Sequence, residues 1–123
     1  MRRRKLATFY LLLILFLTSC SYNKSFVKKS YDTLAVSKEA YNLTMKVLSN
    51  LDSKHLLNPV TKEEVIKYST IYSIAHNEAV KNLAKYQETK SLEDEQRLKE
   101  QLEVVSNSLR KLLKLAKPYL EKL

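Results

Sequence analysis

Three stretches of the chain carry apolar residues at alternating spacings of three and four, which is the period of one face of an α-helix. They cover about residues 25–52, 61–87 and 91–117. The break between the first two contains Asn58-Pro59, and a proline disfavours helical geometry at the residue before it. The pattern therefore predicts three helices of similar length joined by short connections.

The first predicted helix has one apolar stripe with a row of small residues beside it. The stripe is Val27, Tyr31, Leu34, Tyr41, Met45 and Leu48, with Lys38 interrupting it, and the small row is Thr33, Ser37, Ala40 and Thr44. We expect the stripe to be buried. The small row would let a second helix approach closely.

The second predicted helix has a strong start signal. Thr61 and Glu64 have the spacing of a capping box, and Val60 and Val65 occupy the positions of a hydrophobic staple around it. The expected inner face is Val65, Tyr68, Tyr72, Ala75, Ala79, Leu83 and Tyr86. We expect this helix to end near Gln87.

The third predicted helix starts at Ser91, with acidic side chains at 93–95 where the helix dipole favours anions. Its stripe is the most regular of the three and consists of Leu98, Leu102, Val105, Leu109, Leu112 and Ala116. Pro118 is expected to stop or kink the helix, which leaves 119–123 as a short tail.

The fold class that follows is all-α, an antiparallel three-helix bundle, because three apolar stripes can close on one another. The chain contains no glycine and only two prolines. Absence of glycine argues against a dinucleotide-binding fingerprint, a P-loop and a nucleophile elbow. The alternative is an oligomeric coiled coil seeded by the third helix.

The N-terminal segment has the features of an export signal. Residues 1–5 are basic apart from the initiator Met, and residues 6–17 are an apolar run of 12 residues. Such a run is roughly 18 Å long as a helix, short of the ~30 Å hydrocarbon core. Polar residues follow it. We therefore expect a signal peptide over 1–19 that is cleaved, rather than a transmembrane anchor.

The junction itself, Leu17-Thr18-Ser19-Cys20, resembles the lipobox of bacterial lipoproteins. The resemblance implies that the Cys20 thiol receives a diacylglyceryl group, that signal peptidase II cuts before it, and that the new amine is acylated. Two or three acyl chains hold a protein stably on a membrane. The expected organisation is then a signal peptide (1–19), a lipidated tether (20–25) and the bundle (26–123). The alternative is a secreted protein without lipid.

Cys20 is the only cysteine, which excludes an intrachain disulfide and a cysteine-based metal site. Ser21 follows it, where lipoproteins retained in the inner membrane of enteric-type bacteria carry Asp. By that resemblance we expect a lipid-anchored protein at the cell membrane, in the outer membrane and facing the periplasm if the cell is Gram-negative.

The net charge is +9, of which the four cations at residues 2–5 leave with the signal peptide, so the mature side chains carry +5. Export makes nucleic acid a poor partner. Lys24, Lys28 and Lys29 follow the anchor closely and are candidate contacts to an anionic membrane surface. The alternative is ordinary solubilising charge.

Candidate catalytic and metal sites are scarce. His55 and His76 lack the spacing of metal ligands, and we expect neither a metal nor any cofactor beyond the covalent lipid. Tyrosines 31, 41, 68, 72 and 86 fall on or beside the inward stripes. They would form either an apolar ligand groove or a core edge with hydroxyls in water, and we favour the second.

Two segments, Tyr31–Ser37 and Ala75–Val80, resemble parts of small bacterial lipoproteins, some of them associated with prophages. The resemblance carries no catalytic motif. We therefore expect a non-enzymatic, membrane-anchored envelope module that contacts membrane lipid and an envelope protein. The alternative is a prophage-derived lipoprotein that acts in lysis or superinfection exclusion.

Overall fold

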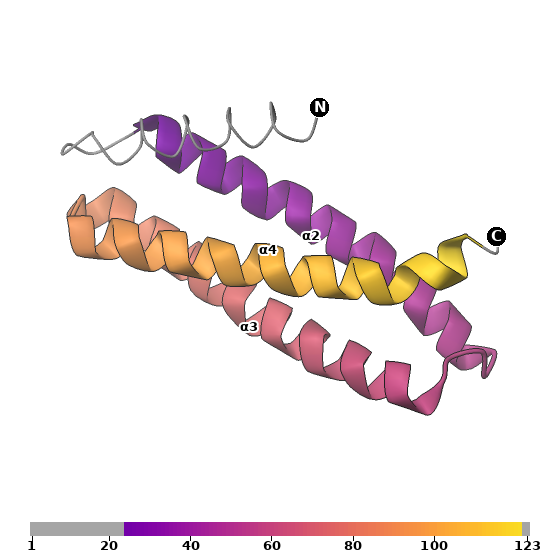
Figure 1. Ribbon diagram of the computed structural model, residues 1–123. Helices are drawn as coiled ribbons and strands as arrows, with labels where there is room; N and C mark the ends of the chain where they lie inside the picture. Colours follow the sequence, from indigo (N-terminus) through magenta and orange to yellow (C-terminus); the bar gives the residue numbers. More distant parts are fainter. Residues whose placement is uncertain (1–23, 122–123) are drawn as a thin grey trace, which may run out of the picture.

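The computed structural model describes residues 24–121. Within that range the chain forms α2 (Lys24–Ser53), α3 (Pro59–Thr89) and α4 (Leu92–Leu120), and no strand. Figure 1 shows α2 and α4 running in one direction and α3 running in the opposite direction. The predicted all-α, antiparallel three-helix bundle is confirmed.

The start of α2 lies at the same end of the bundle as the turn between α3 and α4 (Figure 1). The rings of Phe26 and Tyr86 meet edge to face there, with centroids 6.0 Å apart. Lys24 and Ser25, which the sequence analysis assigned to a tether, already belong to α2. The last two residues of the expected tether are therefore helical.

The interface of α3 with α4 is the most extensive of the three. The predicted stripes of both helices supply it. The buried apolar residues are Val65, Tyr72, Ala75, Ala79, Leu83 and Tyr86 from α3, and Leu98, Val105, Leu112 and Ala116 from α4. Tyr68, Leu102 and Leu109 pack partly buried against them. The apolar period of these two helices thus identifies their inner faces.

The predicted inner face of α2 is wrong in part. Tyr31 is 67% exposed, and the buried residues are Phe26, Ser30, Leu34, Ser37, Thr44 and Leu48. The hydroxyls of Ser30 and Thr44 donate to the carbonyls of Phe26 and Ala40 at 2.7 and 2.8 Å. Because these hydroxyls are satisfied inside the helix, the small residues can be buried at little cost. Of the predicted stripe, Leu34 and Leu48 are buried, and Val27, Tyr41 and Met45 pack partly buried against the core. Of the small row, Ser37 and Thr44 are buried and Thr33 is exposed, so the inner face of α2 combines parts of both.

The predicted start of the second helix is also wrong. The helix begins at Pro59, and Asn58 caps it by accepting a 2.9 Å hydrogen bond from the Val60 N–H. Proline at the first helical position is preorganised for the helix and loses no intrahelical hydrogen bond. Val60 is 66% exposed and does not form the expected staple. The Asn-Pro pair outcompetes the capping box at Thr61.

Both helix ends that need a left-handed residue use one other than glycine. His55 has φ 58° and follows α2, and Lys90 has φ 56° and follows α3. The His55 N–H donates to the Asp52 carbonyl, and the Leu56 N–H donates to the Leu51 carbonyl. These two hydrogen bonds are those of a Schellman motif. Histidine is among the residues that tolerate this conformation better than most.

The C-terminal end of α4 differs from the expectation of a stop at Pro118. The helix continues through Pro118 to Leu120. The Glu121 N–H donates to the Lys117 carbonyl at 3.1 Å, which closes the last turn after the proline. The expected tail is therefore helical for its first two residues.

Candidate functional site

The predicted lipidation site lies outside the described residues. Leu17, Thr18, Ser19 and Cys20 precede Lys24, where the description begins. Their role stays a prediction from the sequence.

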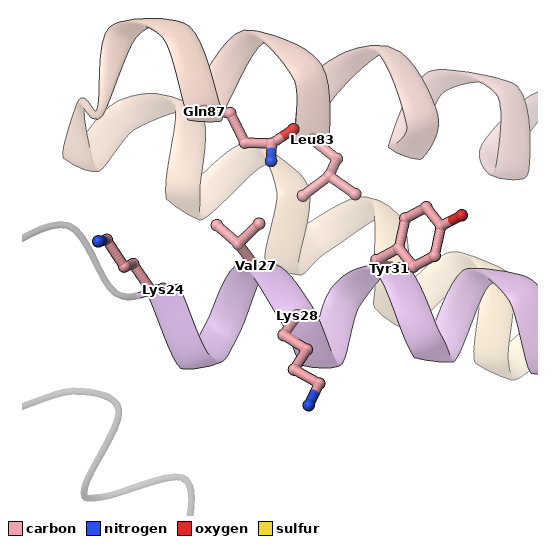
Figure 2. A pocket seen from close by; sticks show the side chains of 6 residues that line it. All are labelled: Lys24, Val27, Lys28, Tyr31, Leu83 and Gln87. Atoms are coloured by element: carbon pink, nitrogen blue, oxygen red, sulfur yellow. The ribbon is translucent and has the colours of Figure 1, made fainter.

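The three candidate membrane-contact lysines lie on the first two turns of α2, and all three are exposed. Lys24 and Lys28 line a groove of about 360 Å³ between the start of α2 and the end of α3. Figure 2 shows this groove. Lys29 is not among the lining residues. The structure thus separates the three lysines into a groove pair and one neighbour.

The other described residues that line this groove come from both helices. Val27 and Tyr31 belong to α2, and Leu83 and Gln87 belong to α3 (Figure 2). Val27 packs against the core, and Leu83 is 6% exposed. Two cations therefore flank an apolar floor. The sequence pattern does not mark Leu83 or Gln87 as site residues, although the antiparallel order of the two helices places the end of α3 beside the start of α2.

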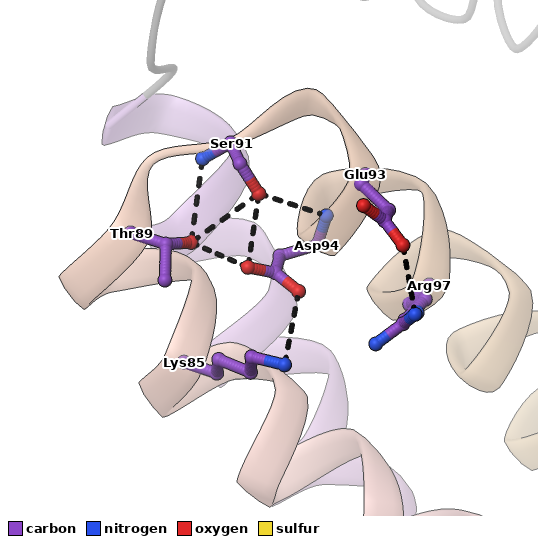
Figure 3. Close-up of polar contacts among 6 residues, drawn as sticks. All are labelled: Lys85, Thr89, Ser91, Glu93, Asp94 and Arg97. Atoms are coloured by element: carbon purple, nitrogen blue, oxygen red, sulfur yellow. Dashed lines mark hydrogen bonds and ion pairs between the residues drawn. The ribbon is translucent and has the colours of Figure 1, made fainter.

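A polar network lies close by, at the turn from α3 to α4. Asp94 is buried and accepts hydrogen bonds from the Thr89 and Ser91 hydroxyls at 2.5 and 2.9 Å. The Lys85 amine is 3.6 Å from its other oxygen. The Ser91 hydroxyl also accepts from the Asp94 N–H, so Ser91 caps α4 as predicted. Figure 3 shows the network.

The Asp94 carboxyl is held in its charged form. The hydrogen bonds from Thr89 and Ser91, together with the charges of Lys85 and Arg97, lower its pKa below the ordinary 3.8, against the opposing effect of desolvation. Every contact in the network is local to the turn. We therefore assign Asp94 to holding the α3–α4 turn rather than to chemistry.

The next residue, Glu95, is a second buried carboxylate. Its Oε1 accepts no hydrogen bond, and the Lys99 amine lies 4.0 Å away as an ion-pair partner. The same amine is 5.4 Å from the centroid of the Phe26 ring. Lys99 thus pairs with Glu95 within α4, and its cation–π contact with Phe26 joins α4 to the first turn of α2.

A second polar cluster lies between the middles of α2 and α3. The rings of Tyr41 and Tyr72 stack with centroids 4.2 Å apart and 13° between their planes. The Tyr72 hydroxyl, in a fully buried side chain, donates to Ser37 at 3.2 Å. Burial raises the pKa of Tyr72 above 10.0, although the Ser37 hydrogen bond acts in the other direction. The favoured interpretation of tyrosines with hydroxyls in water is wrong for Tyr72.

The two histidines have structural contacts. His76 packs at a tilt on Tyr72 with ring centroids 5.6 Å apart, and its Nε2 is 3.2 Å from the Leu34 carbonyl on α2. His55 forms the left-handed cap after α2. In residues 24–121, no three His, Cys, Asp or Glu side chains lie close enough together to hold a metal ion.

Comparisons with protein-family models, with curated proteins and with solved structures find no match to this chain. Of the helices from Lys24 onward, none is both long and apolar enough to cross a membrane.

Proposed function

We propose that this chain is a lipid-anchored lipoprotein of the bacterial cell envelope and a non-enzymatic interaction module. The observation that carries the proposal is the junction Leu17-Thr18-Ser19-Cys20 directly after a basic segment and a short apolar run. Signal peptidase II would leave Cys20 as the lipidated N-terminus. Ser21 favours the outer membrane, facing the periplasm, in a Gram-negative cell.

The position of the bundle supports this proposal. Four residues of extended chain span at most about 14 Å, so a lipid on Cys20 keeps the start of α2 next to the bilayer. Lys24, Lys28 and Lys29 are exposed in that first part of α2. Each lysine near an anionic surface contributes about 1 kcal/mol of attraction. The anchor and the lysines would then act together.

The interaction role is supported by apolar side chains on the outer faces of the helices. Val36 and Leu43 on α2, and Ile66 and Ile74 on α3, are each more than half exposed. A protein partner in the envelope would cover some of them. Crosslinking in whole cells, followed by purification of the chain, should recover one reproducible envelope protein. Recovery of none contradicts the interaction role.

The lipid is tested by growing cells with a labelled fatty acid. The wild-type chain should take up the label and fractionate with membranes, and Cys20→Ala should do neither. Ser19→Ala is the matched control, because it keeps a small residue beside the cysteine. Label that persists in Cys20→Ala contradicts the proposal.

A further inference from the structure

The groove between the start of α2 and the end of α3 presents two lysines that have no ion-pair partner among residues 24–121. Lys24 and Lys28 are four residues apart on α2, and Figure 2 shows their amines pointing in different directions, with that of Lys28 turned away from Leu83 and Gln87. Elsewhere, Lys85 and Lys99 lie beside buried carboxylates, at 3.6 and 4.0 Å. Within residues 24–121 neither groove lysine has an ion pair, and no carboxylate lines the groove. A bound anion would supply a countercharge for both amines.

The floor of the groove is apolar. Val27 from α2 and Leu83 from α3 point toward each other across it, and the ring of Tyr31 stands at its edge, 67% exposed (Figure 2). Gln87 adds an amide that can donate to an oxygen. A free inorganic anion would use the lysines and leave this apolar surface in water. An amphiphile with an anionic head and an apolar tail fits both parts.

We propose that this groove binds one anionic membrane phospholipid. Lys24 and Lys28 contact its phosphate, and the upper part of an acyl chain lies along Val27, Tyr31 and Leu83. This inference rests on the proposed function, because the lipid on Cys20 is what holds the groove at the membrane. It adds a defined binding site to the general attraction between basic residues and anionic lipid.

The test uses the full exported chain in vesicles of phosphatidylcholine, with or without phosphatidylglycerol. An amine-acetylating reagent is added, and mass spectrometry gives the labelling rate of each lysine. We expect Lys24 and Lys28 to label about fivefold more slowly with phosphatidylglycerol, the factor that corresponds to the attraction of one lysine to an anionic surface. Lys54 and Lys114, exposed elsewhere on the bundle, should keep their rates.

A pair of variants distinguishes lipid binding in the groove from a general attraction of the lysines to anionic lipid. Tyr31→Ser removes exposed apolar surface from the groove, whereas Val36→Ser removes it from another face of α2; the two side chains are 67% and 65% exposed. Neither variant changes the charge. The protection of Lys24 and Lys28 from acetylation by phosphatidylglycerol vesicles should be lost in Tyr31→Ser and kept in Val36→Ser. Protection that survives in both variants, or that inorganic phosphate gives with phosphatidylcholine alone, overturns the proposal.

The intact mass of the same sample reports the lipid on Cys20 independently. A lipidated chain whose groove lysines are not protected contradicts the groove and leaves the proposed function standing. A chain without lipid contradicts the proposed function. The acetylation rates of Lys24 and Lys28 in such a chain still test the groove. Slower labelling with phosphatidylglycerol vesicles supports the lipid site, and unchanged rates overturn it.

Discussion

The hydroxyl of Tyr72 on α3 donates a hydrogen bond to Ser37 on α2 at 3.2 Å, inside the bundle. Tyr72 is fully buried, and the Ser37 hydroxyl in turn donates to the Leu34 carbonyl at 3.1 Å. This chain of two hydrogen bonds connects a side chain of one helix to the backbone of another. It fixes how α2 lies against α3.

Ser37→Ala should therefore lower the free energy of unfolding by about 1–3 kcal/mol, because it leaves the Tyr72 hydroxyl buried without a partner. Urea denaturation measures the change. Tyr72→Phe in the Ser37→Ala background removes the orphaned hydroxyl and should recover part of the loss. Additive effects of the two substitutions would contradict the coupling.

The start of α3 gives a second prediction. Asn58→Ala removes the side chain that accepts from the Val60 N–H and should cost about 1 kcal/mol, within the range of N-cap losses. Thr61→Ala is the control, because Thr61 lies inside the helix and not at its cap. A larger loss in Thr61→Ala than in Asn58→Ala would instead place the helix start at the capping box.

The inner faces of the three helices differ in how well the sequence pattern predicts them. The inner faces of α3 and α4 are predictable because their apolar residues repeat without interruption. The face of α2 is predictable only in part, since Ser30, Ser37 and Thr44 are buried among the apolar residues and satisfy their own hydroxyls on nearby carbonyls. Hydropathy alone places such residues outside.

The residues that line the groove can be predicted from the sequence only in part. Its two lysines are visible in the sequence because they follow the predicted anchor. Leu83 and Gln87 are more than 50 residues away and join them only through the antiparallel packing of α2 and α3. No local pattern marks Gln87 as a site residue, and Leu83 is marked only as core.

The charge of Asp94 in the turn between α3 and α4 makes the stability of the fold depend on pH. The pKa of Asp94 is lowered in the folded chain, so the unfolded chain binds a proton more readily. Its stabilising contribution is therefore fully present above pH 3.8 and is lost as the pH falls below that value. Asp94→Asn should be less stable than wild type at pH 7, and the difference should shrink below pH 4.

Glu93→Gln is the matched control for that experiment. Glu93 is exposed and pairs only with Arg97 one turn away, at 2.8 Å. Surface pairs of this kind contribute about 0.5 kcal/mol or less, so Glu93→Gln should follow wild type closely at both pH values. A constant difference between Asp94→Asn and wild type from pH 7 to pH 3 would contradict the role of the Asp94 charge.

Adjacent leucines on α4 test the bundle itself. Leu112 is fully buried, and Leu113 is 42% exposed. Leu112→Ala should lower the free energy of unfolding by about 2–5 kcal/mol, as core truncations do, and Leu113→Ala by much less. Chemical denaturation of both variants measures the difference. Equal losses would mean that the helix presents another face to the core.

In the proposed function, lipid on Cys20 holds this bundle at a membrane. The intact mass of the chain purified from membranes tests it most directly, because one measurement reports both the N-terminal residue and its modification. We predict a chain that begins at Cys20 and carries diacylglyceryl with a further acyl group. A mass equal to an unmodified chain, whether it begins at Met1 or at a later residue, would contradict the account.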